Sequence, residues 1–264
     1  MERTPPIVTI TSDFGWRDFY LARIKGSILK QTPNARIIDI SHDVSNYNIV
    51  EAAYLFGAAW QAFPVGTIHI VSVNDFDQPE QPMLVFQHEG HFFIGPDNGV
   101  FSLVFDQQPS SIYSIDTADI APDNFPLAAV FAKAAGHLAQ DLPVGGLGGA
   151  VEKWLERIAL RPVTGPNHIR GAVIYIDKFE NVILNIDRAV FDAVGRGRPF
   201  ELYFKRHSPI KGISQHFHDV AIGEVLCRFN ASDRLEIAIN MDKAASLLGL
   251  KIDDTVQVDF TGKM

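Results

Sequence analysis

The chain has 264 residues and a formal net charge of −8, from 23 basic and 31 acidic side chains. A net acidic chain without a basic stripe argues against a nucleic-acid partner. The single cysteine, Cys227, excludes an intrachain disulfide and a zinc site built from paired cysteines. We expect a cytoplasmic protein without a membrane partner, because no apolar run is long enough to span a bilayer and the amino terminus lacks a signal-peptide pattern.

Strand-like and helix-like segments alternate over the first third of the chain. Short apolar runs predict strands at 7–10, 36–40 and 67–73, and apolar residues at helical spacing predict helices at 19–31 and 49–63. This alternation favours a parallel sheet with helices on its faces. Ligands bind at the carboxyl ends of the strands in sheets of this kind.

Polar side chains follow each of the three predicted strands. Asp13 comes after the first, His42 after the second, and Asn74 and Asp75 after the third. A carboxylate such as Asp13 at a strand end can accept two hydrogen bonds from the vicinal diol of a ribose. It can also cap the following helix or turn, which is the commoner role of aspartate when spacing is the only information.

The pattern of predicted elements changes after these strands. A hairpin at 83–94, a turn at 95–99, a helix at 127–138 and a glycine-rich connection at 142–149 precede a proline-rich and glycine-containing linker near residue 165. Beyond the linker we expect one helix, at 243–248, and short strands at 171–175, 182–186, 200–204, 237–239 and 255–260. We therefore predict an α/β domain of residues 1–164 followed by a smaller, mainly β domain of residues 165–264.

A turn between two of the later strands gathers a second set of polar groups. Asp177, Phe179 and Asn181 offer a carboxylate, an aromatic face and an amide, which together suit an amino acid or a nucleoside. An ordinary hairpin turn is the alternative, because Asp and Asn are favoured in turns for conformational reasons.

Taken together, six ordered segments resemble one family. They are TITSDFG at 9–15, IIDISH at 37–42, GTIHIV at 66–71, GPDNG at 95–99, IDKFENV at 176–182 and LEIAIN at 235–240. In this order they resemble landmarks of the S-adenosyl-L-methionine hydroxide adenosyltransferases, which are related to the fluorinase and chlorinase enzymes. The resemblance extends from about residue 7 to residue 260.

The resemblance implies an N-terminal α/β domain with a mainly parallel central sheet flanked by helices, followed by a β-barrel-like C-terminal domain. It also implies a homotrimer in which the ligand lies between the N-terminal domain of one subunit and the C-terminal domain of the next. S-adenosylmethionine is the implied substrate or ligand, with no cofactor. We expect no metal either, because the pair His216 and His218 has no third ligand fixed by spacing.

The family's binding residues can be carried over by motif. Asp13 would hold the ribose hydroxyls, Asp177 and Asn181 the amino-acid end of methionine, and Phe179 would lie near the adenine. The remaining positions placed among the substrate-binding residues are Asp18, Tyr47, Phe76, Asn230, Asn240 and Met241. The 95–99 segment identifies the family and is expected to be structural, because two glycines around Asp-Asn are typical of a turn.

The chain departs from the family where the resemblance implies catalytic groups. The family has Asp and, shortly afterwards, Arg following the third strand, and here Asn74 and Gln81 take those positions. The family's later His is replaced by Pro126, which cannot act as a base. We therefore place Asn74, Asp75 and Gln81 at the catalytic positions. Asp75 and Asp77 are the nearest carboxylates, and a one-residue shift would put Asp75 near the lost Asp.

Two interpretations follow from these departures. The first is a divergent hydrolase, in which water or hydroxide attacks the 5′ carbon of S-adenosylmethionine to give adenosine and methionine. Positioning alone can sustain such a reaction, because a general base contributes about 10²–10⁴-fold to a typical rate. The alternative is a regulatory protein that binds S-adenosylmethionine or adenosine without turnover. A halogenase ranks last, because no feature of the sequence builds a halide site.

Overall fold

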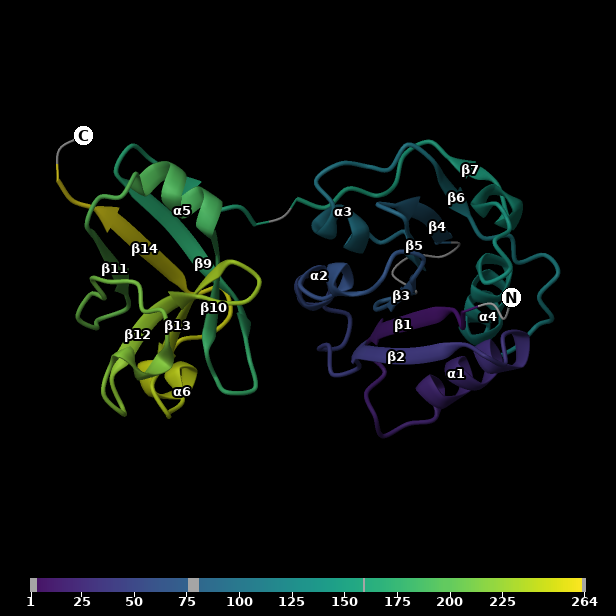
Figure 1. The fold of residues 1–264 in the computed structure, drawn as a ribbon, viewed down its shortest axis with the longest axis horizontal. Helices are drawn as coiled ribbons and strands as arrows, with labels where there is room; N and C mark the ends of the chain where they lie inside the picture. Colours follow the sequence, from purple (N-terminus) through teal and green to yellow (C-terminus); the bar gives the residue numbers. More distant parts are fainter. Residues whose placement is uncertain (1–3, 76–80, 159, 263–264) are drawn as a thin grey trace. The chain divides into compact units, whose positions relative to one another are not determined.

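The computed structural model describes residues 4–75, 81–158 and 160–262. The chain forms two compact units, Met1–Ile158 and Ala159–Met264, each with its own hydrophobic core (Figure 1). The predicted domain boundary after residue 164 lies a few residues beyond this division, at the end of a short strand. As a boundary between functional domains it stays a prediction.

A seven-stranded sheet forms the centre of the N-terminal unit, with the strand order β2-β1-β3-β5-β4-β6-β7. Strands β2, β1, β3 and β5 pair in parallel, whereas β4, β6 and β7 extend the sheet by antiparallel pairing. The strands are β1 (Ile7–Ser12), β2 (Arg36–Ser41), β3 (Ile68–Ser72), β4 (Met83–His88), β5 (His91–Pro96), β6 (Ile112–Ser114) and β7 (Ala150–Val151). The apolar runs predicted β1, β2 and β3, whereas β5 was predicted as the second strand of the 83–94 hairpin.

Helices cover both faces of this sheet. On one face, α1 (Tyr20–Gln31) and α4 (Leu127–Leu138) bury a core with Ile10 and Ile70. On the other face, α2 (Ile49–Gly57) and α3 (Val100–Val104) pack in a second core with Phe86 and Phe93. Short 3₁₀ helices occur at η1 (Trp60–Ala62) and η2 (Val144–Leu147). The alternation of side chains along each strand explains why the sheet feeds two cores.

The C-terminal unit is an antiparallel sheet with the order β11-β14-β9-β10-β13-β12, to which β8 adds at β9. The strands are β8 (Val163–Thr164), β9 (His168–Ile176), β10 (Val182–Asp187), β11 (Phe200–Phe204), β12 (Val225–Phe229), β13 (Arg234–Ile239) and β14 (Thr255–Phe260), with η3 (Phe217–Asp219) between β11 and β12. Figure 1 shows this sheet curling around its own core, with α5 and α6 at its sides. The predicted fold class is therefore confirmed.

One helix of the C-terminal unit was not predicted. Besides α6 (Ala244–Leu248), the chain forms α5 (Arg188–Gly195), for which the sequence analysis expected no helix. Asp187 caps α5 by accepting a hydrogen bond from the Val190 amide at 2.7 Å, and Phe191 anchors it in the core. The prediction of a single helix in this unit was wrong, because a two-turn helix gives too short a periodic signal to separate it from a loop.

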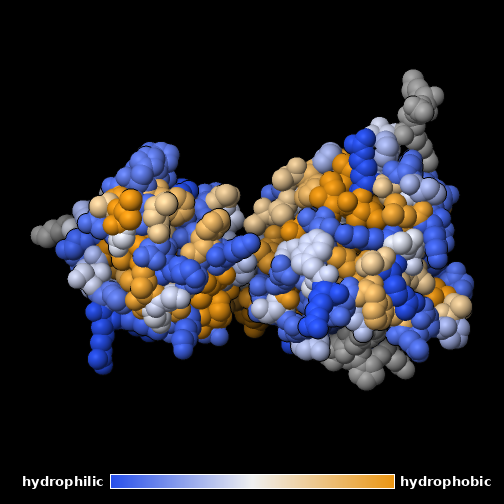
Figure 2. All heavy atoms as spheres, turned by 90° about the horizontal axis from the view of Figure 1, so that it is seen from below, coloured by the Kyte–Doolittle hydropathy of each residue, from blue (hydrophilic) through white to orange (hydrophobic). Residues whose placement is uncertain are grey.

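Apolar and polar side chains are interspersed on the surface that Figure 2 shows. Among the described residues, no helix combines the length and the apolar character needed to cross a membrane.

Candidate active site at the carboxyl ends of the parallel strands

Asp13 joins the ends of the parallel strands in the N-terminal unit. It follows β1, which lies between β2 and β3. Its Oδ2 accepts hydrogen bonds from the Tyr47 amide at 2.9 Å and from the Asn74 amide at 3.4 Å. Three loops that are distant in sequence therefore meet at one carboxylate, at the sheet edge where ligands bind in this class of fold.

Asp13 does not have the helix-capping role that was considered as the alternative to ribose binding. Helix α1 begins at Tyr20, and Phe19 at its start makes no side-chain capping bond, so Asp13 does not cap it. Among the described residues, both hydrogen bonds that Asp13 accepts go to Oδ2. The geometry leaves Oδ1 for a ligand, and the ribose role of Asp13 stays a prediction.

The turn after β3 carries the most perturbed carboxyl group of this edge. Asp75 is 6% exposed, and its Oδ2 accepts a hydrogen bond from the Ser72 hydroxyl at 2.7 Å. Burial raises the pKa of Asp75 to about 7, the Ser72 bond opposes that rise, and the negative charge of Asp13 adds to it. Among the described residues, Oδ1 of Asp75 has no hydrogen-bond partner. A carboxyl group of this kind can accept a proton near neutral pH.

The 95–99 segment holds this turn in place. Asn98 is fully buried, and its Nδ2 donates to the carbonyl oxygens of Val73 at 2.8 Å and Asn74 at 3.1 Å. Its Oδ1 accepts from the Val100 amide at the start of α3, at 3.0 Å. Gly99 has a φ of 92°, which favours glycine. The side-chain amide of Asn98 thus fixes the backbone that presents Asp75.

The other predicted site residues of the N-terminal unit make fewer contacts with Asp13 and Asp75. Tyr47 contributes its amide to Asp13, while its side chain is 71% exposed. Asp18 is exposed in the loop between β1 and α1, and Gln81 is half-buried just before β4. Phe76 lies outside the described residues.

Asp177, Phe179 and Asn181 lie together in the turn between β9 and β10, within the C-terminal unit. Oδ1 of Asp177 accepts from the amides of Phe179 at 2.9 Å and Asn181 at 2.8 Å, and Oδ2 accepts from the Asn181 side chain at 2.9 Å. Phe179 is 75% exposed, whereas Asn181 is buried. The aspartate therefore shapes the turn, and it presents an aromatic ring to the surface.

The three remaining predicted residues flank β13. Oδ1 of Asn230 accepts from the amides of Ser232 at 3.0 Å and Arg234 at 3.1 Å, which closes the turn before the strand. Asn240 is buried after the strand and donates to the Val220 carbonyl at 2.8 Å. Met241 is 83% exposed and has a φ of 61°.

Glu236 was given no role by the sequence analysis, although it lies on β13 between Asn230 and Asn240. It is 5% exposed, and its Oε1 lies 3.4 Å from Nε of Arg228. Burial raises the pKa of Glu236 to about 7, Arg228 opposes the rise, and the negative charge of Asp177 adds to it. The sequence feature that could have singled out Glu236 is a lone carboxylate between Leu235 and Ile237 in an otherwise apolar strand.

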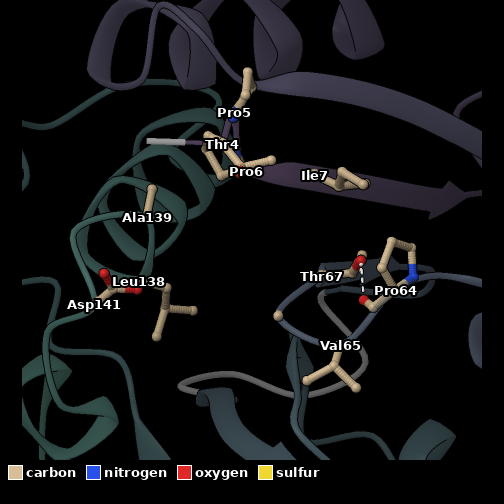
Figure 3. A pocket seen from close by; sticks show the side chains of 11 residues that line it. Thr4, Pro5, Pro6, Ile7, Pro64, Val65, Thr67, Leu138, Ala139 and Asp141 are labelled. Carbon is tan, nitrogen blue, oxygen red and sulfur yellow. Dashed lines mark hydrogen bonds between the residues drawn. The ribbon is translucent and has the colours of Figure 1, made fainter. Parts of the chain in front are cut away.

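A separate cavity of about 250 Å³ lies at the opposite edge of the N-terminal sheet. Figure 3 shows it between the start of β1, the turn before β3 and the end of α4, with the Thr67 hydroxyl donating to the Pro64 carbonyl at 2.7 Å. It lies at the amino ends of the strands, away from Asp13 and Asp75, so it is not the candidate site. Among the described residues, no three His, Cys, Asp or Glu side chains converge as a metal site would need.

Comparison with known proteins identifies the family. Residues 8–148 match the SAM hydroxide adenosyltransferase N-terminal domain, and residues 171–257 match the C-terminal domain of the same family. The chain belongs to the SAM hydroxide adenosyltransferase family. The resemblance noted in the sequence is thereby confirmed.

Relatives of this adenosyltransferase-family chain match it over nearly its whole length. A protein of Methanocaldococcus jannaschii named (R)-S-adenosyl-L-methionine hydrolase is 28% identical over 96% of this chain and 95% of its own. A protein of Thermus thermophilus with the same name is 29% identical over 92% and 96%. A protein of an Actinoplanes species named fluorinase is 23% identical over 96% and 97%. The crystal structure of a conserved protein from Thermotoga maritima has a TM-score of 0.86 and 27% identity, covering 96% of this chain and 99% of that one.

The positions at which this SAM hydroxide adenosyltransferase-family chain departs from the expected pattern have structural roles. Asn74 has a φ of 53° and gives its amide to Asp13 and its carbonyl to Asn98. Pro126 is the N-cap residue directly before α4, where no helical hydrogen bond needs its missing amide hydrogen, and its carbonyl accepts from the Ala129 amide at 2.9 Å. Asp75 is the titratable group that this turn retains.

Proposed function

We propose that the protein binds S-adenosyl-L-methionine and hydrolyses it to adenosine and L-methionine. The observation that carries the proposal is the match, over nearly the whole chain, to proteins named (R)-S-adenosyl-L-methionine hydrolase. The buried carboxyl group of Asp75, with a pKa near neutrality at the ligand edge of the sheet, supports turnover over binding alone.

In the proposed mechanism, a water molecule attacks the 5′ carbon in line with the bond to sulfur. The carbon–oxygen bond forms as the carbon–sulfur bond breaks, and the electron pair of that bond neutralises the sulfonium. Methionine leaves as a neutral thioether and needs no acid. The proton lost by the water goes to Oδ1 of Asp75, which has no other described partner.

This mechanism fixes the direction of the pH dependence. Asp75 accepts a proton only when it is ionised, and burial raises its pKa to about 7. The rate should therefore rise with pH through about 7 and level off above it. Asn74 and Gln81 do not titrate, so they would position water and substrate by hydrogen bonds.

In this proposal the substrate contacts residues of the N-terminal unit at the strand ends and residues of the C-terminal unit in the turns that flank β10 and β13. Asp13 would hold the ribose, with Asp18 and Tyr47 beside the ligand. Phe76 was carried over as a substrate-binding residue as well and lies outside the described residues. Asp177 and Asn181 would hold the amino-acid end, and Phe179, Asn230, Asn240 and Met241 the adenine. The positive charge of the substrate suits a site that combines the carboxylates Asp13, Asp75 and Asp177.

We further propose a homotrimer in which each ligand site draws on two subunits, as the resemblance implies, and light scattering of the purified protein tests it. A cytoplasmic location belongs to the same proposal, and cell fractionation tests that. The buried, free thiol of Cys227 agrees with a reducing compartment.

The test is to incubate the protein with S-adenosylmethionine and measure adenosine and methionine by chromatography, from about pH 5.5 to about pH 8.5. We expect equal amounts of both products, a rate that rises through about pH 7, and a loss of about 10²–10⁴-fold in Asp75→Asn. Asp97→Asn is the matched control, because burial also raises the pKa of Asp97, which accepts from the Leu155 amide. It should keep the pH profile.

Two outcomes would contradict parts of the proposal. Binding without products would show a regulatory protein that retains ligand and lacks turnover. Products whose pH profile survives in Asp75→Asn would remove Asp75 from the mechanism and leave hydrolysis intact.

A further inference from the structure

A chain of polar side chains, buried at Ser12 and His42 and partly exposed at Asp39 and Lys25, lies beside the Asp13 turn. The Ser12 hydroxyl is 2.7 Å from Nδ1 of His42, and Nε2 of His42 is 2.9 Å from Oδ1 of Asp39. Oδ2 of Asp39 accepts from the Lys25 ammonium at 2.6 Å. Ser12 and His42 are 0% and 1% exposed. The chain thus connects helix α1 to the residue that precedes Asp13.

An irregularity in the β1–β2 pairing brings Ser12 and His42 together. Ile10 pairs with Asp39, but Thr11 pairs with Ser41, so the register skips one residue of β2. The bulge places His42 level with Ser12 across the two strand ends, which is how bulges re-aim side chains beside functional sites.

The protonation state of this chain follows from its partners. Burial pushes the pKa of Asp39 up, but its close contacts with His42 and Lys25 outweigh that effect and hold the pKa below its usual range. Nε2 of His42 and Oδ1 of Asp39 lie 2.9 Å apart without the alignment of a hydrogen bond, so the contact is electrostatic. The negative charge of Asp39 favours the tautomer that carries the proton on Nε2. Nδ1 then accepts from the Ser12 hydroxyl, whose oxygen also receives the Phe14 amide at 3.5 Å.

His42 also contacts the other side of the Asp13 turn, through its backbone carbonyl and through its ring. The His42 carbonyl accepts from the Gly15 amide at 2.9 Å, at a glycine whose φ is 67°. The ring of Trp16 meets the His42 ring edge-on, with centroids 4.7 Å apart. Residues on both sides of Asp13, Ser12 before it and Gly15 and Trp16 after it, therefore contact His42.

Charged groups from three segments face His42. Burial lowers the pKa of His42, Asp39 on β2 and Asp43 in the following loop raise it, Lys25 on α1 lowers it, and the net change is downward from its usual value. The neutral imidazole is therefore the resident form near neutral pH. Protonation would add a hydrogen to Nδ1, which would point at Ser12 and reverse the bond between them.

We propose that His42 is a positioning residue whose neutral form holds the Asp13 turn in its binding shape, so that protonation of His42 weakens adenosine binding. The inference rests on the proposed function, because it takes Asp13 as the ribose-binding group. Ser12 is not a nucleophile in this arrangement, since its hydroxyl is buried and engaged. Binding and protonation are linked, so adenosine should lower the pKa of His42 by the same coupling with which protons weaken adenosine binding.

The experiment measures adenosine affinity by calorimetry with the full-length protein between about pH 5 and about pH 8. An Asp75→Asn, Glu236→Gln background removes the two carboxyl groups whose pKa burial raises to about 7. We expect affinity to fall by about 3- to 10-fold toward the acid end, because the Ser12–His42 hydrogen bond reverses and the Ser12 hydroxyl must turn away from its position in the Asp13 turn. His42→Gln keeps a donor for Asp39 without titrating, and its affinity should not change with pH over this range.

A second readout does not depend on a variant. The ring nitrogens of His42, followed by NMR in the full-length protein, should titrate at lower pH when adenosine is bound. A purely structural histidine would show the same titration with and without adenosine.

The outcomes separate the two proposals. Adenosine binding with the same pH dependence in His42→Gln, or with an unchanged His42 titration, would overturn the role of His42 and leave the proposed function standing. If neither adenosine nor S-adenosylmethionine bound at any pH, both proposals would fail.

Discussion

A single carboxylate, Asp13, combines a structural and a predicted binding role through different oxygens. Oδ2 receives the amides of Tyr47 and Asn74, and the geometry leaves Oδ1 for a ribose. Because one side chain serves both purposes, its removal should affect ligand affinity through direct contact and through loop position. Substitution of Asp13 is therefore the most direct test of the binding hypothesis.

We expect Asp13→Ala to weaken adenosine binding by about 10- to 100-fold, because a charged acceptor for the ribose diol is lost. Asp43→Ala is the control, since Asp43 is also an exposed-loop carboxylate at a neighbouring strand end. Calorimetry at about pH 8, where His42 is neutral, gives both affinities. Equal affinities for the two variants would rule out the ribose role of Asp13.

At the scale of elements, the candidate site depends on a turn held by a side chain from another loop. The Asn98 amide replaces the backbone partners that the Val73 and Asn74 carbonyls would have in a regular strand. Such buried bonds are costly to break because the carbonyls have no access to water.

We therefore expect Asn98→Ala to lower the free energy of unfolding by about 1–3 kcal/mol, through unsatisfied buried carbonyl groups. It should also lower the affinity for adenosine, because Asn74 supports Asp13. Urea denaturation and calorimetry measure the two effects. Ser102→Ala, which removes a hydroxyl bonded to the Gly99 carbonyl at 2.8 Å in the same segment, is the matched control. Unchanged stability of Asn98→Ala would show that the turn does not need the Asn98 amide.

Much of this element arrangement could be predicted from the sequence. Asp13, His42 and Asn74 were each predicted to follow a strand of a parallel sheet. They lie at the same end of the sheet because β1, β2 and β3 are parallel neighbours. The Ser12–His42 contact was beyond prediction, because it requires the one-residue bulge in the β1–β2 register, which depends on tertiary packing. The same holds for Glu236, whose closeness to Asp177 arises from pairing between strands far apart in sequence.

At the scale of the whole molecule, the N-terminal core contains two histidines that face each other. Nδ1 of His69 is 2.7 Å from the Thr9 hydroxyl, and its Nε2 is 3.1 Å from Nδ1 of His91. Burial, together with the neighbouring His91, lowers the pKa of His69 to about 3. Trp60 and Phe93 enclose the pair.

The folded pKa of His69 is below its unfolded value of 6.5, so the neutral ring favours the folded state. Its contribution to stability is complete above about pH 6.5 and is lost progressively as pH falls toward about 3, with a size of up to roughly 4 kcal/mol. We expect urea denaturation between about pH 8 and about pH 4.5 to show this loss, and His69→Gln to show a shallower one. Parallel pH profiles for the two proteins would contradict the assignment.

The turn around Asp177 differs from the junction at Asp13 in one respect that bears on how such sites can be rebuilt. The three side-chain hydrogen bonds that Asp177 accepts close within residues 177–181. Glu180 of the same turn ties it to α6, because its carbonyl accepts from the Ala245 amide at 2.9 Å and its carboxylate from the Ser246 amide at 3.0 Å. A graft of this turn onto another antiparallel hairpin would therefore have to include that one helical partner. Asp13, by contrast, draws on loops after three strands, so those loops can change in length or composition only together.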